Sequence, residues 1–193
     1  KGFTAAYNAI RKFCKVKYVL ATNSGTSSLF LALKIAGVKK NHEVIVPTIT
    51  FIAPINAVSY NGARPIFMDT DNSLNIEQDK TIQFLEKFTY MHNGFTYNIK
   101  TKKRIAAIIF VHTFGNLCKI DKLLTECKKR NIITIEDAAE SLGAYYNRGR
   151  FKNKYAGTVA DIGCYSFNGN KIITTGAGGA LVTNNKKFYT LAC

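Results

Sequence analysis

The sequence lacks any long apolar segment and any closely spaced pair of cysteines. No run approaches the ~18 consecutive apolar residues that a transmembrane helix requires, so we expect no membrane association. The 5 cysteines are widely spaced and form no C-x-x-C pair. This usage argues against a disulfide framework and against a zinc site, and it is typical of a reducing compartment. We therefore expect a cytoplasmic protein.

The glycine motifs of nucleotide-binding proteins are also missing. There is no G-x-x-x-x-G-K-[ST] sequence, and the late glycines at positions 176, 178 and 179 do not form G-x-G-x-x-G. A nicotinamide-dependent oxidoreductase is therefore an alternative with little support.

Acidic residues are scarce, because 12 Asp and Glu stand against 27 Lys and Arg, and the formal net charge is +15. Such a surplus occurs in nucleic-acid-binding proteins, in proteins that attract phosphorylated substrates, and on ordinary lysine-rich surfaces. The basic residues form separate short groups, such as 102–104 and 128–130, and no nucleic-acid-binding motif accompanies them. A basic nucleic-acid-binding domain remains an alternative, but we do not expect nucleic acid as a partner.

Short apolar segments alternate with segments of helical periodicity along most of the chain. Helical spacing predicts helices over 4–15, 27–38, 51–62, 76–87 and 120–130, and apolar runs predict strands over 18–22, 43–47, 64–69, 105–112, 131–137 and 161–167. This alternation indicates right-handed β-α-β units. The predicted fold class is α/β, in three layers: a mostly parallel sheet with helices on both faces. Residues 88–104 follow neither pattern, and we expect a loop insertion there.

In such sheets ligands bind beyond the carboxyl ends of the strands. The sequence "NSGT", which contains Gly25 and Thr26, follows the first predicted strand and opens a helix. Helix N-termini favour anions, although the same residues also form ordinary N-caps. The two interpretations are equally supported by this motif alone.

Further polar and aromatic residues follow the other predicted strands. Phe51 could stack on a flat ring or belong to the core, and His112 is most simply an ordinary strand-end histidine. Asp137 could pair with a protonated ring nitrogen or cap a helix. Lys171 stands alone among Asn, Thr and Gly in "SFNGNKIITTGAGG". Since all these positions should meet at one edge of the sheet, we favour a chemical role for Lys171.

The order of motifs resembles the DegT-type sugar-nucleotide aminotransferases, which are fold type I pyridoxal phosphate enzymes. Six landmarks carry the resemblance: "NSGTSSL", "HEVIVPTITFIAPINAV", "GARPIFMD", "VHTFG", "IEDAAESLGA" and "SFNGNKIITTGAGG". The insert before "VHTFG" and the "SFNGNK" form also resemble the subgroup that makes 4-amino sugars for legionaminic acid-type nonulosonates. The resemblance covers nearly the whole chain and implies that residues 1–193 are the pyridoxal phosphate-binding large domain, without the smaller C-terminal domain. The start at Lys1 and the final "KKFYTLAC", which resembles a truncated helix, also lead us to expect a fragment.

The resemblance assigns roles to individual positions. Ser166, Gly25 and Thr26 stand where the family holds the cofactor phosphate. Phe51 stands at the ring-stacking position, and Asp137 stands at the position that pairs with the pyridine nitrogen.

The lysine and a neighbouring carboxylate complete the implied site. Lys171 is at the position where the family links the cofactor covalently, and the ring-dehydratase relatives have a histidine there instead, so Lys171 argues for transamination. Glu140 takes the place of the family's usual Gln or His near the ring hydroxyl. Ala177 replaces a frequent Glu or Gly, which puts a role for that side chain in doubt.

The expected function is transfer of an amine from L-glutamate to a 4-keto sugar on a nucleoside diphosphate, with pyridoxal 5'-phosphate as cofactor and a homodimer as the assembly. The main alternative is a truncated or inactive homologue without a catalytic role. We expect this chain alone to bind the cofactor weakly or not at all and to turn over negligibly, even as a dimer.

Overall fold

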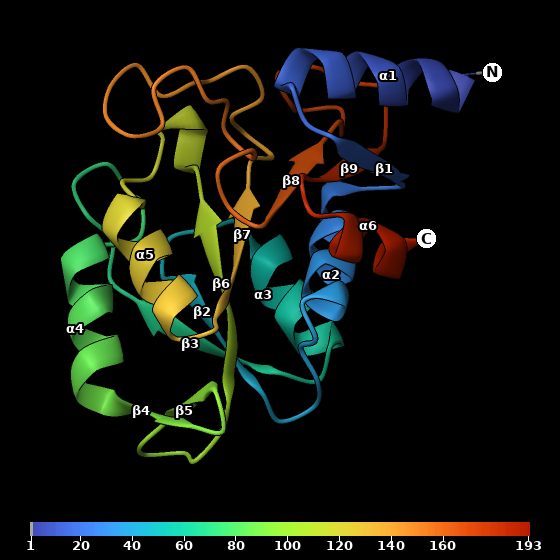
Figure 1. The fold of residues 1–193 in the computed structure, drawn as a ribbon. Coiled ribbons are helices and arrows are strands. Elements are labelled where there is room, and N and C mark those ends of the chain that lie inside the picture. The colour runs from blue at the N-terminus through green and yellow to red at the C-terminus, as the bar shows by residue number, and fades with distance from the viewer. Residues whose placement is uncertain (1) are drawn as a thin grey trace.

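The computed structural model describes residues 2–193, which are built around a seven-stranded sheet of order β1-β9-β8-β7-β6-β2-β3 (Figure 1). Neighbouring strands are parallel, except that β9 runs antiparallel to both β1 and β8. The mostly parallel sheet is therefore confirmed, whereas β9 has no counterpart among the predicted strands. The bounds are β1 Tyr18–Thr22, β2 Glu43–Pro47, β3 Arg64–Met68, β6 Ile105–Val111, β7 Ile133–Asp137, β8 Ile162–Ser166 and β9 Gly179–Thr183.

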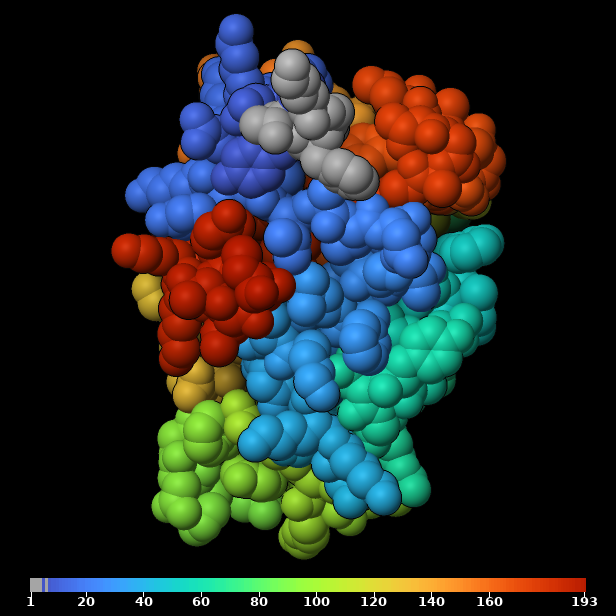
Figure 2. All heavy atoms as spheres, turned by 90° about the vertical axis from the view of Figure 1, so that its right-hand side faces the viewer, coloured from blue at the N-terminus to red at the C-terminus, as the bar shows by residue number. Residues whose placement is uncertain are grey.

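Helices cover both faces of this sheet, which confirms the three predicted layers. Their bounds are α1 Gly2–Cys14, α2 Gly25–Ile35, α3 Ile52–Tyr60, α4 Gln78–Phe88, α5 Asp121–Lys129 and α6 Lys186–Ala192. One apolar cluster joins α2, α3 and α6 to the sheet, through residues such as Leu33, Ala57 and Phe188. A separate cluster on the opposite face contains Leu85 of α4 and Leu123 of α5. Figure 2 shows α6 packed beside α2 on the first of these faces.

The central strand β6 shows why the sequence forms this architecture. All 7 residues of "IAAIIFV" are buried, as expected for a parallel strand with helices on both faces. Its alternate side chains enter opposite clusters, with Ile109 in one and Ile108 in the other. The continuous apolar run is therefore the direct consequence of a position at the middle of three layers.

The predicted loop at 88–104 is wrong, because most of this segment forms a β-hairpin. Strands β4 (Thr89–His92) and β5 (Phe95–Asn98) pair antiparallel at the lower end of the molecule in Figure 1. The two-residue turn between them has positive φ at both Asn93 (47°) and Gly94 (77°). Asn-Gly between two runs of β-forming residues is a strong sequence signal for such a turn. The sequence therefore contained the signal for a hairpin turn at Asn93-Gly94, but the polar residues on either side did not form the apolar runs by which the strands were predicted.

The carboxyl ends of β1, β2, β6, β7 and β8 lie along one edge of the sheet, since these strands all run in the same direction. The segments that follow them therefore converge at this edge, at the end of the sheet away from the β4–β5 hairpin (Figure 1). Among residues 2–193, no helix combines the length and apolarity needed to cross a membrane.

Candidate active site

A cavity of about 450 Å³ opens at the carboxyl edge of the sheet. Its lining comes from the segments after β1, β2, β6, β7 and β8, and it brings together every site residue predicted from the sequence. Those residues are Gly25, Thr26, Phe51, Asp137, Glu140, Ser166 and Lys171.

One end of the cavity is formed by the first turn of α2 and the last residue of β8. Ser24 is the N-cap of α2, and its Oγ accepts the backbone N–H of Ser27 at 3.1 Å. A Cβ atom at Gly25 would lie only 2.8 Å from the Cβ of Ser166 and 3.2 Å from its Oγ. The missing side chain at Gly25 is therefore what lets the helix terminus approach the Ser166 hydroxyl. Backbone N–H groups and two hydroxyls, those of Ser166 and Thr26, thus border the space where an anion would sit.

Asp137 stands at the end of β7 and is 6% exposed. It points to the α2 side of the sheet, because Ile135, two residues earlier, belongs to the cluster under α2. Its Oδ1 accepts the Ala139 N–H at 3.1 Å, but the following residues form turns, so the helix-cap interpretation is wrong. Burial raises the pKa of Asp137 from 3.8 to about 6, although the Ala139 N–H and the nearby Lys171 act in the opposite direction. Within residues 2–193 no basic side chain forms an ion pair with this carboxylate.

Lys171 lies in the turn after β8, where its backbone N–H donates to Asn168 O at 3.0 Å. Its side chain is only 13% exposed, so the ammonium points into the cavity rather than into bulk water. Nζ lies 3.5 Å from Glu140 Oε1 and 5.8 Å from the centroid of the Phe51 ring. Phe51 itself is 68% exposed, which excludes the core interpretation.

Glu140 also connects Lys171 to a residue that the sequence analysis missed. Its second carboxylate oxygen, Oε2, accepts the N–H of Phe114 at 3.0 Å. Phe114 has a φ of 53°, a left-handed conformation that costs an aromatic residue about 1–2 kcal/mol, and its side chain is 74% exposed at the cavity mouth. The "TFG" sequence gave no clear sign of this, since only the glycine that follows marks a bend.

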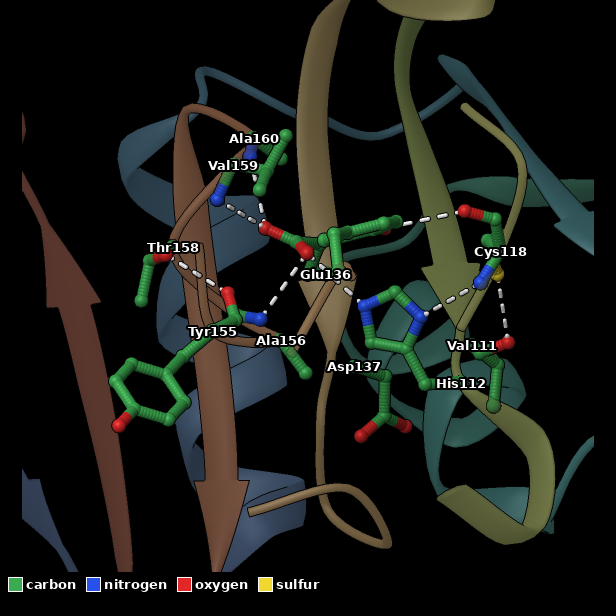
Figure 3. Close-up of polar contacts among 12 residues, drawn as sticks. Val111, His112, Cys118, Glu136, Asp137, Tyr155, Ala156, Thr158, Val159 and Ala160 are labelled. Carbon is green, nitrogen blue, oxygen red and sulfur yellow. Dashed lines mark hydrogen bonds and ion pairs between the residues drawn. The ribbon is translucent and has the colours of Figure 1, made fainter. Parts of the chain in front are cut away.

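A buried polar network joins the ends of β6 and β7 beside the cavity, which His112 also lines (Figure 3). His112 and Glu136 are both 0% exposed, and His112 Nε2 lies 2.9 Å from Glu136 Oε1. His112 Nδ1 accepts the backbone N–H of Cys118 at 3.2 Å. His112 is thus a histidine with both ring nitrogens satisfied, in agreement with the sequence-based interpretation.

The cavity fits a flat, phosphorylated cofactor better than a metal ion. No cluster of three or more potential metal-ligating side chains occurs in residues 2–193. The close approach of the α2 N-terminus to Ser166 at Gly25 gathers N–H groups and hydroxyls at one end of the cavity, where they suit an anion, and the buried Oγ1 of Thr50, which lines the same cavity, has no hydrogen-bond partner. The donors, the exposed aromatic ring, the buried carboxylate and the lysine are the groups that pyridoxal phosphate requires.

A second cavity, of about 470 Å³, lies beside α1 and does not compete with this assignment. It is lined mainly by apolar residues and glycines, among them Ile10, Phe13 and Phe167, and none of its lining residues is charged. Its lining includes the hydroxyl residues Tyr7, Thr22 and Thr175 but no carboxylate, amine or imidazole that could activate a hydroxyl.

Several known proteins are similar to this chain in both sequence and fold. GDP-perosamine synthase from Escherichia coli O157:H7 is 40% identical over 174 residues, which are 90% of this chain and 42% of that protein. UDP-4-amino-4,6-dideoxy-N-acetyl-beta-L-altrosamine transaminase from Campylobacter jejuni is 35% identical over 94% of this chain and 43% of its own length. The structure of E. coli GDP-4-keto-6-deoxy-D-mannose-3-dehydratase with bound hydrated PLP superposes with a TM-score of 0.80 at 26% identity, covering 99% of this chain and 46% of that one.

The chain thus spans less than half the length of these relatives. The model of one sequence family matches residues 5–192, almost the whole chain. This chain belongs to the DegT/DnrJ/EryC1/StrS aminotransferase family.

Proposed function

We propose that this chain forms the pyridoxal phosphate-binding part of an aminotransferase that moves an amine from L-glutamate to a 4-keto sugar carried on a nucleoside diphosphate. The observation that carries the proposal is Lys171. Its ammonium is largely shielded from water, 3.5 Å from Glu140, in the same cavity as Asp137 and the Gly25–Ser166 cradle.

Each end of the cavity suits one part of the cofactor. The N-terminus of α2, with Thr26 and Ser166, would bind the phosphate, and Phe51 would lie against the ring. Asp137 is a buried carboxylate without a basic partner among residues 2–193, so a protonated ring nitrogen would supply the missing cation. Glu140 would lie near the ring hydroxyl, where it would share a proton with that oxygen.

When bound, pyridoxal phosphate supplies the electron sink that transamination needs. The protein supplies the remaining functions. Asp137 would keep the ring nitrogen protonated, and Lys171 Nζ would hold and return the proton that moves during amine transfer. The partly enclosed cavity keeps bulk water away from that proton.

The substrate class rests on the relatives. The names of the E. coli and C. jejuni proteins describe amino sugars on GDP and UDP, respectively, and an amine at position 4 is named in the latter. A homodimer and a cytoplasmic location remain part of the same proposal. The surplus positive charge of +15 favours encounter with a diphosphate group.

Covalent trapping tests the cofactor assignment directly. Incubation with excess pyridoxal phosphate, followed by borohydride reduction and peptide mapping, should label Lys171, even if affinity is low. Lys171→Ala should abolish that adduct and leave the fold intact, because the contact that the substitution removes, between Nζ and Glu140 Oε1, is long at 3.5 Å and adds little stability. Surface lysines on the same peptide map serve as the internal control. An adduct at this site that persists in Lys171→Ala would refute the assignment.

The same experiment separates the enzyme from a non-catalytic homologue. An inactive homologue would keep its fold, but Lys171 would not be labelled in preference to exposed lysines. Lys122, whose side chain is 67% exposed, is such a lysine. Selective labelling followed by loss of the label on addition of L-glutamate before reduction would favour the aminotransferase.

A further inference from the structure

A fully buried carboxylate lies one residue before the candidate partner of the ring nitrogen. Glu136 is 0% exposed and accepts four hydrogen bonds (Figure 3). Its Oε1 accepts from His112 Nε2 at 2.9 Å and from the Gly157 N–H at 3.0 Å. Its Oε2 accepts from the N–H groups of Val159 at 2.8 Å and Ala160 at 2.7 Å. The carboxylate is thus surrounded by donors on both oxygens.

These contacts determine where the proton of His112 lies. The backbone N–H of Cys118 can only donate, so Nδ1, which accepts from it at 3.2 Å, carries no proton. Nε2 must then carry the proton and donate it to Glu136. The surrounding hydrogen bonds therefore assign a neutral imidazole in a single tautomer.

The network ties the ends of two strands together. Besides the His112–Glu136 contact, the backbone N–H of His112 donates to Asp137 O at 3.1 Å. Successive side chains of a strand point to opposite faces, so Glu136 faces away from the side of β7 that carries the Asp137 carboxylate. Glu136 can therefore act on the cavity only through the backbone and through His112.

We propose that Glu136 is a positioning residue for the cofactor site, an inference that rests on the function proposed above. By holding His112 as the Nε2-protonated imidazole, it fixes the carboxyl ends of β6 and β7. The Asp137 carboxylate is then placed to meet the ring nitrogen. The phosphate cradle is built on α2 and the last residue of β8, and none of the four hydrogen bonds of Glu136 reaches Gly25, Thr26 or Ser166.

Glu136→Gln removes the charge while preserving the shape. In either orientation of the amide, its NH2 group replaces an oxygen that accepts two hydrogen bonds. The two N–H groups that bonded to that oxygen then face another donor and lose their acceptor. Two changes at His112 then separate its two contacts. His112→Gln keeps a donor that can reach Glu136, whereas His112→Asn keeps only an acceptor near the Cys118 N–H. Glu86→Gln, at an exposed position on α4, is the matched control.

The test has one readout without cofactor and one with two ligands. Nitrogen-15 NMR of the wild-type chain should show His112 with Nδ1 unprotonated and Nε2 protonated. Glu136→Gln should weaken pyridoxal phosphate binding about tenfold, the effect of one lost hydrogen bond to a charged group, and leave the affinity for inorganic phosphate unchanged. His112→Gln should bind pyridoxal phosphate nearly as the wild type does, and His112→Asn should resemble Glu136→Gln.

Three results would overturn the proposal: a proton on His112 Nδ1, an equal loss of affinity for both ligands in Glu136→Gln, or full pyridoxal phosphate affinity in that variant. If Glu136→Gln does not fold, the two His112 variants take its place. Equal affinities of His112→Gln and His112→Asn for pyridoxal phosphate would then overturn the proposal. A wild-type chain that binds phosphate but not pyridoxal phosphate would instead remove the proposed function, and the positioning role with it.

Discussion

Gly25→Ala tests the anion cradle, because the added methyl group meets a defined obstacle. The new Cβ would lie 2.8 Å from Ser166 Cβ, whereas ordinary contacts begin near 3.4 Å, so the two segments must separate by about 0.6 Å. Gly25 has no positive φ, and alanine is therefore compatible with its backbone. Any destabilisation would come from the steric contact alone.

The expected magnitude follows from two opposing effects. Overpacking at a close contact costs about 1–3 kcal/mol, and replacing glycine by alanine in a helix returns at most about 1 kcal/mol. The net loss of unfolding free energy should lie within about 0–3 kcal/mol, and its midpoint of about 1.5 kcal/mol lowers the Tm of a chain of this size by about 3–6 °C. Inorganic phosphate and pyridoxal phosphate should both bind more weakly, since the Ser166 hydroxyl moves away from the helix terminus.

Thermal unfolding and ligand titration of matched variants measure these effects. Gly169→Ala is the control, because Gly169 lies near Lys171 and a Cβ there would meet nothing within 4 Å. In a Ser166→Gly background the obstacle is gone, so Gly25→Ala should cost no stability, and the coupling in the double-mutant cycle should be at least about 1 kcal/mol. Equal behaviour of Gly25→Ala and Gly169→Ala, or an undiminished cost in the Ser166→Gly background, would refute the reasoning.

Two further variants test the ring end of the site and the distant hairpin. Burial raises the pKa of Asp137 from 3.8 to about 6, so the native state holds a proton that the unfolded chain releases, and stability falls by up to about 3 kcal/mol as the pH rises from 4 to 6. Asp137→Asn, which keeps an acceptor for the Ala139 N–H, should therefore be more stable than the wild type at pH 7 but not at pH 4, and it should lose transamination far more than bound cofactor; parallel stability–pH curves would contradict this. Gly94→Ala places a side chain at a φ of 77°, so hydrogen exchange in the β4–β5 hairpin should speed up by about fivefold, the effect of about 1 kcal/mol, while borohydride labelling of Lys171 stays unchanged.

The sequence alone determined the architecture and the membership of the site. Apolar runs and helical spacing report which faces of each element are buried, and parallel strands necessarily end at a common edge. This is why residues as distant as Gly25, Asp137 and Lys171 could be assigned to one cavity before their distances were known. The Asn93-Gly94 turn was also encoded locally, and it was overlooked rather than hidden.

Tertiary structure alone decided the relations between segments that are remote in the chain. The 2.8 Å approach at Gly25 joins positions 141 residues apart and depends on how α2 packs against β8. The antiparallel insertion of β9 between β1 and β8 is a choice of pairing partner, which side-chain periodicity does not specify. The raised pKa of Asp137 and the tautomer of His112 depend on burial and on donors from other segments. Periodicity indicates which side of a helix or strand is buried, but only tertiary packing determines which groups meet on that side and at what distance.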